Sequence, residues 1–198
     1  VIHANLREAL EATRIVDSDG GGTLNSGAKS AALSIFEGTK QRFFAQLLLS
    51  LKLPSLLPAI EAALAADHAV VVQLVSTSEA MLDRRLADLS DAEREALEID
   101  LSPREAVVLY LEKSFPVRLM AVFTDENGNP RSEPMIDEQG NPVLCRAAVA
   151  ARDRMIEQLC ALPPIAPALD AIIERFGVDA IAEVTGRSRR LIVGADGR

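Results

Sequence analysis

The chain has 198 residues, of which 48% are hydrophobic and 25% charged, so it is long enough for one good core or for two partial cores that belong to a larger protein. Only 4% of the residues are aromatic while Ala and Leu abound, which predicts a mostly aliphatic core in which helix outweighs strand. The net charge of −8 argues against tight, autonomous binding of nucleic acid, because affinity for a phosphate backbone comes chiefly from clustered Lys and Arg.

Cysteine use and the length of the apolar runs indicate a cytoplasmic protein that does not enter a membrane. Two cysteines, Cys145 and Cys160, in a chain without a signal peptide fit a reducing compartment, and we expect two buried thiols rather than a disulfide. Apolar runs such as residues 69–75 are far shorter than the roughly 20 residues needed to span a bilayer. Because the chain starts at Val1 without Met and closes on LIVGADGR, a strand and turn signal with no partner strand after it, we expect both ends to be truncated.

The N-terminal third of the chain predicts three helices. Residues 1–14 show the apolar spacing of a short helix, and the Gly- and Asp-rich residues 17–27 predict an exposed loop after it. Residues 28–51 predict a long helix that Pro54 ends, and residues 56–66 predict a further helix.

Two short apolar blocks predict strands of a parallel sheet. Residues 69–75, AVVVQLV, form a continuous apolar run of the kind that a sheet covered on both faces requires. A polar turn at 76–78 and a helical pattern at 79–89 follow it, which is the order that opens an α/β unit. The second block, DAIAEVTG, lies at residues 179–186, about a hundred residues later and far beyond a minimal crossover. We therefore expect 69–75 and 180–184 to be neighbouring parallel strands with a large insertion between them.

The insertion opens with a helix and then changes character. Ser102 as a cap, Pro103 at the first position and Glu105 three residues after the serine predict a helix that runs to about residue 114. Two similar turn signals, DENGNP and DEQGNP, lie between short strand-like runs and predict a β-meander over 115–145. Further helices are predicted at 146–162 and 166–176, the second ended by Gly177.

The loop before the long helix contains two motifs that resemble ligand sites. Residues 22–30, GTLNSGAKS, approach a phosphate-binding loop, but Ala28 interrupts the final Gly-Lys-Ser and no convincing buried strand precedes it. Asp17, Asp19 and Asn25 alternate in the manner of calcium ligands, yet Ala28 stands where that loop needs a bidentate glutamate. In both cases we favour a solvated loop that leads into a helix.

The remaining residues give no self-contained active site. His3 and His68 with two distant cysteines offer no metal-ligand spacing, and no Gly-x-Ser-x-Gly elbow or Cys and His nucleophile pair occurs. Arg187, Arg189 and Arg190 follow a predicted strand in an otherwise acidic chain, and planar guanidinium groups suit contact with phosphate. This cluster is the best local candidate for a nucleotide or nucleic-acid contact, with an exposed basic hairpin as the equal alternative.

Three segments in order resemble the Strawberry notch family of helicases and NTPases, in particular its bacterial and phage-borne branch. They are FEGTKQRFFAQLLLSLKLPSLL at 36–57, AVVVQLVSTSEA at 69–80 and IAEVTGRSRRLI at 181–192. Their order and spacing are similar to the segment that joins the two motor lobes of that family. The resemblance implies a superfamily-2 helicase with two RecA-like lobes, which bind ATP and magnesium and track nucleic acid.

On this resemblance the chain is α/β and helix-rich, with a partial RecA-like parallel sheet and a helical and β-meander insertion. Residues 1–66 would be the helical end of the first lobe and the linker, and 67–90 the first strand and helix of the second lobe. Residues 91–177 would be the insertion, and 178–198 the second strand and a truncated hairpin.

The resemblance also implies which residues face a ligand. Ser76 and Thr77 would face the nucleic-acid side of the second lobe, at the carboxyl edge of the sheet where α/β proteins place ligands. Thr185, Gly186 and Arg187 would lie at the same edge, followed by the other arginines of the cluster, Arg189 and Arg190.

What the chain lacks shapes the expected activity. The phosphate-binding loop and the acidic magnesium motif of the family would lie before Val1, and its final arginine after Arg198. We therefore expect no catalytic residue, metal or cofactor in the chain itself, no ATPase activity of the fragment, and the remainder of the parent helicase as partner, with nucleic acid bound through it. The alternatives are a non-catalytic protein-interaction module on an α/β scaffold and a phosphate-binding protein that uses the arginine cluster.

Overall fold

The computed structural model describes residues 1–18, 22–74, 102–163 and 165–184. The chain divides into two compact units, and each is built from two separate stretches of sequence. The first unit comprises Val1–Phe43 and Arg104–Pro163, and the second comprises Phe44–Pro103 and Pro164–Arg198.

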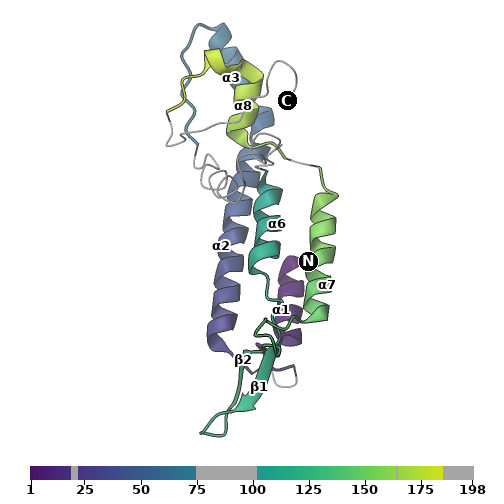
Figure 1. Ribbon diagram of the computed structural model, residues 1–198. Coiled ribbons are helices and arrows are strands. Elements are labelled where there is room, and N and C mark those ends of the chain that lie inside the picture. The colour runs from purple at the N-terminus through teal and green to yellow at the C-terminus, as the bar shows by residue number, and fades with distance from the viewer. Residues whose placement is uncertain (19–21, 75–101, 164, 185–198) are drawn as a thin grey trace. The chain divides into compact units, whose positions relative to one another are not determined.

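The described residues form six α-helices, one short 3-10 helix and one two-stranded antiparallel sheet (Figure 1). Helix therefore outweighs strand, as the composition predicts. In chain order the elements are α1 (Ile2–Ala12), α2 (Ser26–Leu51), α3 (Leu53–Ala65), α6 (Pro103–Ser114), β1 (Met120–Thr124), β2 (Pro130–Pro134), α7 (Arg146–Cys160), α8 (Ala168–Phe176) and the 3-10 helix η1 (Val178–Ala180).

Helix α1 buries one side and ends at a residue that caps it. Its buried residues, Leu6, Ala9 and Leu10, recur at the spacing of one helix face. The hydroxyl of the buried Thr13 donates a hydrogen bond of 2.6 Å to the carbonyl of Ala9, and Arg14 then turns the chain with a φ of 62°. The predicted short helix is confirmed.

The next two helices meet at a proline, as predicted. Helix α2 begins after Asn25, whose Oδ1 accepts a hydrogen bond of 2.9 Å from the backbone N–H of Ala28 and so satisfies one of the free amides of the first turn. It ends at Leu51, and α3 begins at Leu53 with Pro54 in its first turn. Proline cannot continue one helix but suits the start of the next, where its missing N–H has no partner to lose.

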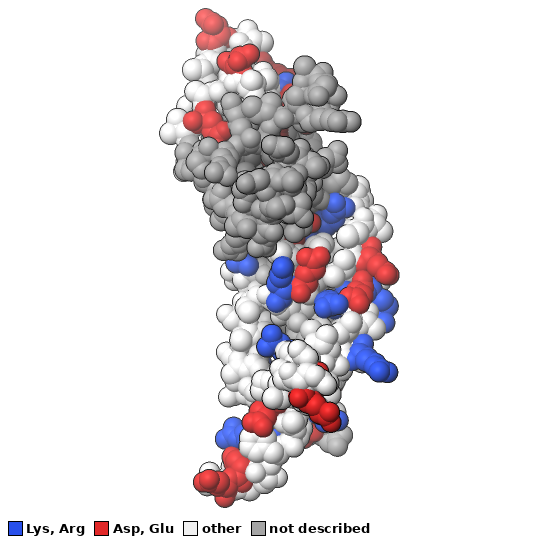
Figure 2. All heavy atoms as spheres, viewed as in Figure 1, with Lys and Arg blue, Asp and Glu red and all other residues white. Residues whose placement is uncertain are grey.

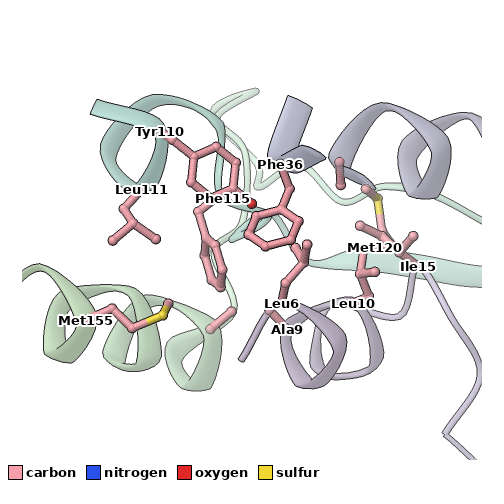
Figure 3. Close-up of a cluster of buried hydrophobic side chains, with 12 residues drawn as sticks. Leu6, Ala9, Leu10, Ile15, Phe36, Tyr110, Leu111, Phe115, Met120 and Met155 are labelled. Carbon is pink, nitrogen blue, oxygen red and sulfur yellow. The ribbon is translucent and has the colours of Figure 1, made fainter. Parts of the chain in front are cut away.

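The core of the first unit combines residues from α1, α2, α6, β1 and α7. Three aromatic rings lie at its centre, and Figure 3 shows those of Phe36, Tyr110 and Phe115 close to one another. The ring centroids of Phe36 and Tyr110 are 5.9 Å apart, and those of Tyr110 and Phe115 are 6.4 Å apart in an edge-to-face arrangement. The buried members are Leu6, Ala9, Leu10, Ile15, Ala32, Phe36, Tyr110, Leu111, Phe115, Met120, Ala148 and Met155.

The region predicted as a β-meander holds a hairpin and a second, smaller turn. Strands β1 and β2 pair antiparallel with Met120 opposite Pro134 and Thr124 opposite Pro130. After β2, single bridges join Ile136 to Pro142 and Arg118 to Leu144 around the second turn. Both turn sequences therefore form turns, each with its glycine at positive φ, 80° for Gly128 and 83° for Gly140.

The described part of the second unit is built on α3 and α8. Leu53, Ala168 and Ile172 form its buried cluster. On the surface, Arg175 Nε of α8 lies 2.7 Å from Glu61 Oε1 of α3. Helix α8 ends, as predicted, before Gly177, which has a φ of 81°.

The two predicted parallel strands are wrong over their described residues. Residues 69–74 and 181–184 form neither helix nor strand, and residue 180 belongs to η1. Val71 and Val184 are 94% and 97% exposed, while Leu74 and Ile181 pack against the cluster on α3 and α8. A β-branched run favours extended backbone, but a strand also needs a neighbour that pairs with its N–H and C=O groups. Val75 and residues 185–186 lie outside the described ranges.

Candidate functional site

The loop that resembles a phosphate-binding loop is tied to its surroundings by its own polar groups. Lys29 Nζ lies 2.9 Å from Thr23 Oγ1, so the lysine bonds within the loop. Asn25 caps α2 through Oδ1 and donates a hydrogen bond of 2.9 Å from Nδ2 to the carbonyl of Ser132 in β2. The loop therefore fixes the start of α2 and the hairpin to each other, which agrees with its interpretation as a loop leading into a helix.

The two turns that follow β1 and β2 carry acidic side chains with a structural role. Asp125 Oδ1 accepts hydrogen bonds from the backbone N–H groups of Asn127 and Asn129, at 3.0 and 2.8 Å. Asp137 repeats the pattern with the backbone N–H groups two and four residues later. These bonds, the backbone bond four residues on foremost, hold the pKa of both carboxyl groups below the usual range.

Both carboxylates are thus used to hold their turns. Figure 2 shows acidic atoms over the turn end of the hairpin. Within the described ranges, no group of three or more His, Cys, Asp or Glu side chains is placed to hold a metal ion.

Among the described residues, Tyr110 has the largest shift in pKa, and it lies in the core rather than in a site. Its side chain is 4% exposed, and burial raises its pKa to about 12. Among the described residues its hydroxyl has no hydrogen-bond partner. The rings of Phe36 and Phe115 pack beside it, so no reacting group could approach it without opening the core.

The two cysteines are unpaired, but they are not both buried as predicted. Cys145 is half-buried, and its Sγ lies 3.4 Å from the carbonyl oxygen of Ala12, whereas Cys160 is exposed. Helix α7 buries Ala148, Ala151 and Met155 along one face, and Leu159 continues that face. Cys160 follows Leu159 by one residue and so points about 100° away from it around the helix.

The outer edges of the hairpin differ from each other. The edge of β2 is closed: Ser132 N–H donates a hydrogen bond of 3.1 Å to the carbonyl of Leu24, and Pro130 and Pro134 have no N–H to offer. Strand β1, with the sequence MAVFT, has neither a proline nor a charge, and Val122 and Phe123 are 48% and 45% exposed. Sequence reasoning missed this difference, although the spacing of the two prolines in PRSEP signals it.

The residues predicted to contact nucleic acid or phosphate are not placed by the structure. All of them lie outside the described ranges: Ser76, Thr77, Thr185, Gly186, Arg187, Arg189 and Arg190.

Comparisons with known proteins found no family model, no curated protein and no solved structure that matches the chain. Among the described helices, none is by itself long and apolar enough to cross a membrane; α2 and α3 pass that test only when taken together across a bend of 45°.

Proposed function

We propose that this chain is part of a Strawberry notch-like, ATP-dependent nucleic-acid helicase or remodeller that works in the cytoplasm. It contributes surfaces of the second RecA-like lobe and of an insertion, while groups elsewhere in the parent protein bind ATP and magnesium. The observation that carries the proposal is the order and spacing of the three family-like segments at 36–57, 69–80 and 181–192.

The division of the chain supports an insertion between two parts of one lobe. Residues 69–74 and 181–184 belong to the same compact unit, although residues 104–163, which lie between them in sequence, belong to the other unit. Leu74 and Ile181, one from each block, pack against the same cluster.

The decisive experiment compares ATP hydrolysis by the chain with that of the parent protein. Hydrolysis needs a cradle of amides, a lysine, an acid that holds magnesium and usually an arginine from the opposite lobe, and the resemblance places these groups outside residues 1–198. The parent should hydrolyse ATP with stimulation by nucleic acid, and the chain alone should not exceed a buffer blank. Magnesium-dependent hydrolysis by the chain alone, or an inactive parent, overturns the proposal.

The arginine cluster is tested in the parent by replacing Arg187, Arg189 and Arg190 with Ala. Stimulation by nucleic acid and its salt-dependent binding should fall more than thermal stability. A matched control removes the same charge from three exposed arginines of the first unit, Arg7, Arg146 and Arg154. Full stimulation in the cluster variant, or an equal loss in the control, shows that the cluster makes no specific contact.

A non-catalytic interaction module is the second candidate function, and the open edge of β1 is the observation that favours it. Exposed strand edges are sites where a second chain can add a strand. The reading frame of the parent separates the two candidates: a Gly-Lys-Thr loop upstream supports the helicase, and a natural start at Val1 supports the module.

A further inference from the structure

The two outer edges of the hairpin differ in how their backbone N–H and C=O groups are protected from a further strand. Native sheets protect an edge with prolines, charges or a covering segment, because unpaired N–H and C=O groups attract another strand. The edge of β2 has two prolines, and the backbone N–H and C=O groups of Ser132 are hydrogen-bonded to Leu24 and Asn25 in the loop before α2. Strand β1 has none of these beyond its first residue, Met120, whose N–H donates a hydrogen bond of 2.9 Å to the carbonyl of Thr13.

The hydrogen-bond pattern shows which backbone groups of β1 face outward. In an antiparallel pair, alternate residues bond across the ladder, and those between them point away from it. The N–H of Asp125 bonds across the hairpin to the carbonyl of Asn129, so the odd-numbered residues bond toward β2. The N–H of Met120 bonds away from the hairpin, to the carbonyl of Thr13, so the even-numbered residues of β1 face outward. In the described structure, the outward N–H and C=O groups of Val122 and Thr124 have no partner.

We infer that this edge binds a second copy of the chain, with the two β1 strands antiparallel across a two-fold axis at Phe123. In this register Val122 of one chain lies opposite Thr124 of the other, and each of these two pairs exchanges two N–H to C=O bonds. The open edge is therefore complementary to itself, as a two-fold interface must be. This inference does not depend on the helicase proposal.

The side chains are compatible with this register on both faces of the extended sheet. The two Phe123 rings lie opposite each other in a pair without hydrogen bonds, where side chains come closest, and aromatic pairs stabilise such positions. On the same face, Ala121 lies opposite the second copy's Asp125, and on the other face Val122 lies opposite the second copy's Thr124. No like charges oppose each other, and Asp125 already bonds to Arg131, with 3.1 Å between Oδ2 and Nε.

The size of the contact sets its strength. Five residues from each chain bury far less than the roughly 1,200 Å² of a standard stable interface, so the dimer should be weak and depend on concentration. A weak dimer still brings two chains into one defined register, and that register can be tested by cross-linking.

The first experiment introduces Phe123→Cys into the full chain with both native cysteines replaced by serine. Cα atoms in an antiparallel pair without hydrogen bonds are about 4.5 Å apart, within the range of a disulfide. Mild oxidation should therefore give a cross-linked dimer. The matched control, Ala121→Cys on the same face, places the two cysteines about 13 Å apart along the strands and should stay monomeric. No cross-linking of the Phe123→Cys variant, or equal cross-linking of the control, overturns the inference.

The second experiment measures self-association by sedimentation over a wide range of concentrations. Val122→Pro removes an outward N–H but leaves the ladder to β2 intact, so association should weaken about tenfold or more through the loss of two of the four bonds. Val122→Thr keeps the N–H and a β-branched side chain, and it should associate like the native chain. A chain that stays monomeric throughout, or a dimer that Val122→Pro leaves unchanged, overturns the inference.

Discussion

The two compact units bury their apolar residues in different ways. In the first unit, helices α1, α2, α6 and α7 and strand β1 all contribute to one cluster with aromatic rings at its centre. In the described part of the second unit, the buried members of the cluster come from α3 and α8, and Leu49 of α2, Leu74 and Ile181 pack against them. Both units have apolar runs, so apolar composition alone does not determine the size of a core. The core of the first unit is larger because several helices and a strand contribute side chains to the same cluster.

The largest expected effect comes from the centre of the first core. Leu111 is fully buried in α6, and replacing it with Ala removes its contacts and leaves a cavity, which should lower the free energy of unfolding by about 3 kcal/mol. Leu144→Ala is the matched control, because that side chain is 50% exposed and its truncation should change stability by less than about 0.5 kcal/mol. Urea unfolding followed by circular dichroism measures both, and equal effects would contradict the position of the core.

The second unit should respond less, and separately. Ile172 in α8 is 6% exposed, and Ile172→Ala should lower the free energy of unfolding of that unit by about 2 kcal/mol, because a small cluster can relax around the gap. The fluorescence of Tyr110, which lies in the first unit, should keep its native unfolding midpoint while circular dichroism shows an earlier transition. If both signals shift together, the two units unfold as one, which contradicts the expectation that each unit has its own stability.

Alkaline pH should act on the first core through Tyr110. Its pKa is about 12 in the folded chain against 10.0 for a tyrosine exposed to water, so between these values the unfolded chain loses a proton that the folded chain keeps. Stability is therefore complete below pH 10 and falls as the pH rises, by about 1.4 kcal/mol at pH 11.

The measurement for Tyr110 is direct, because the chain has one Tyr and no Trp. Absorbance at the tyrosinate band should titrate near pH 12 in the native state and near pH 10 in urea. Tyr110→Phe should remove this loss of stability above pH 10 and leave stability at neutral pH unchanged or slightly higher, since its hydroxyl has no partner among the described residues. A native titration near pH 10 would show that the core is open to water.

The smallest of these effects tests how the first unit holds its hairpin. Asn25 caps α2 and bonds to the carbonyl of Ser132, so Asn25→Ala should lower the free energy of unfolding by about 1 kcal/mol and speed amide exchange in β2. Asn5→Ala is the control, because Asn5 is at the exposed start of α1 and bonds only to the carbonyl of Val1. Equal effects of the two changes would mean that the loop does not hold the hairpin.

Sequence patterns predicted the helix ends and turns that are fixed by interactions between residues close together in the chain. Helix starts and stops were predictable because Pro54, Pro103 and Gly177 act on their own backbone. The turns at Asp125 and Asp137 were predictable for the same reason, since each aspartate bonds to amides within four residues.

Features that depend on remote partners were not predictable in the same way. The blocks at 69–74 and 181–184 have strand composition, but pairing depends on a neighbour that the local sequence cannot specify. Cys160 was expected to be buried because free thiols usually are, but it lies one residue after Leu159 and so off the face of α7 that meets the core. The open edge of β1 became visible only when the alternating hydrogen bonds showed which residues face outward.

The way the first unit is assembled from two stretches of chain has a consequence for its synthesis. Helix α1 packs against α7, and Cys145 at the start of α7 contacts Ala12, 133 residues earlier in the chain. As the chain leaves the ribosome, α1 and the first part of α2 emerge long before α6 and α7, so their apolar faces stay uncovered while residues 44–103 are made. The first unit can close only by a long-range step, so its folding should be slower than that of a helical protein built from local contacts.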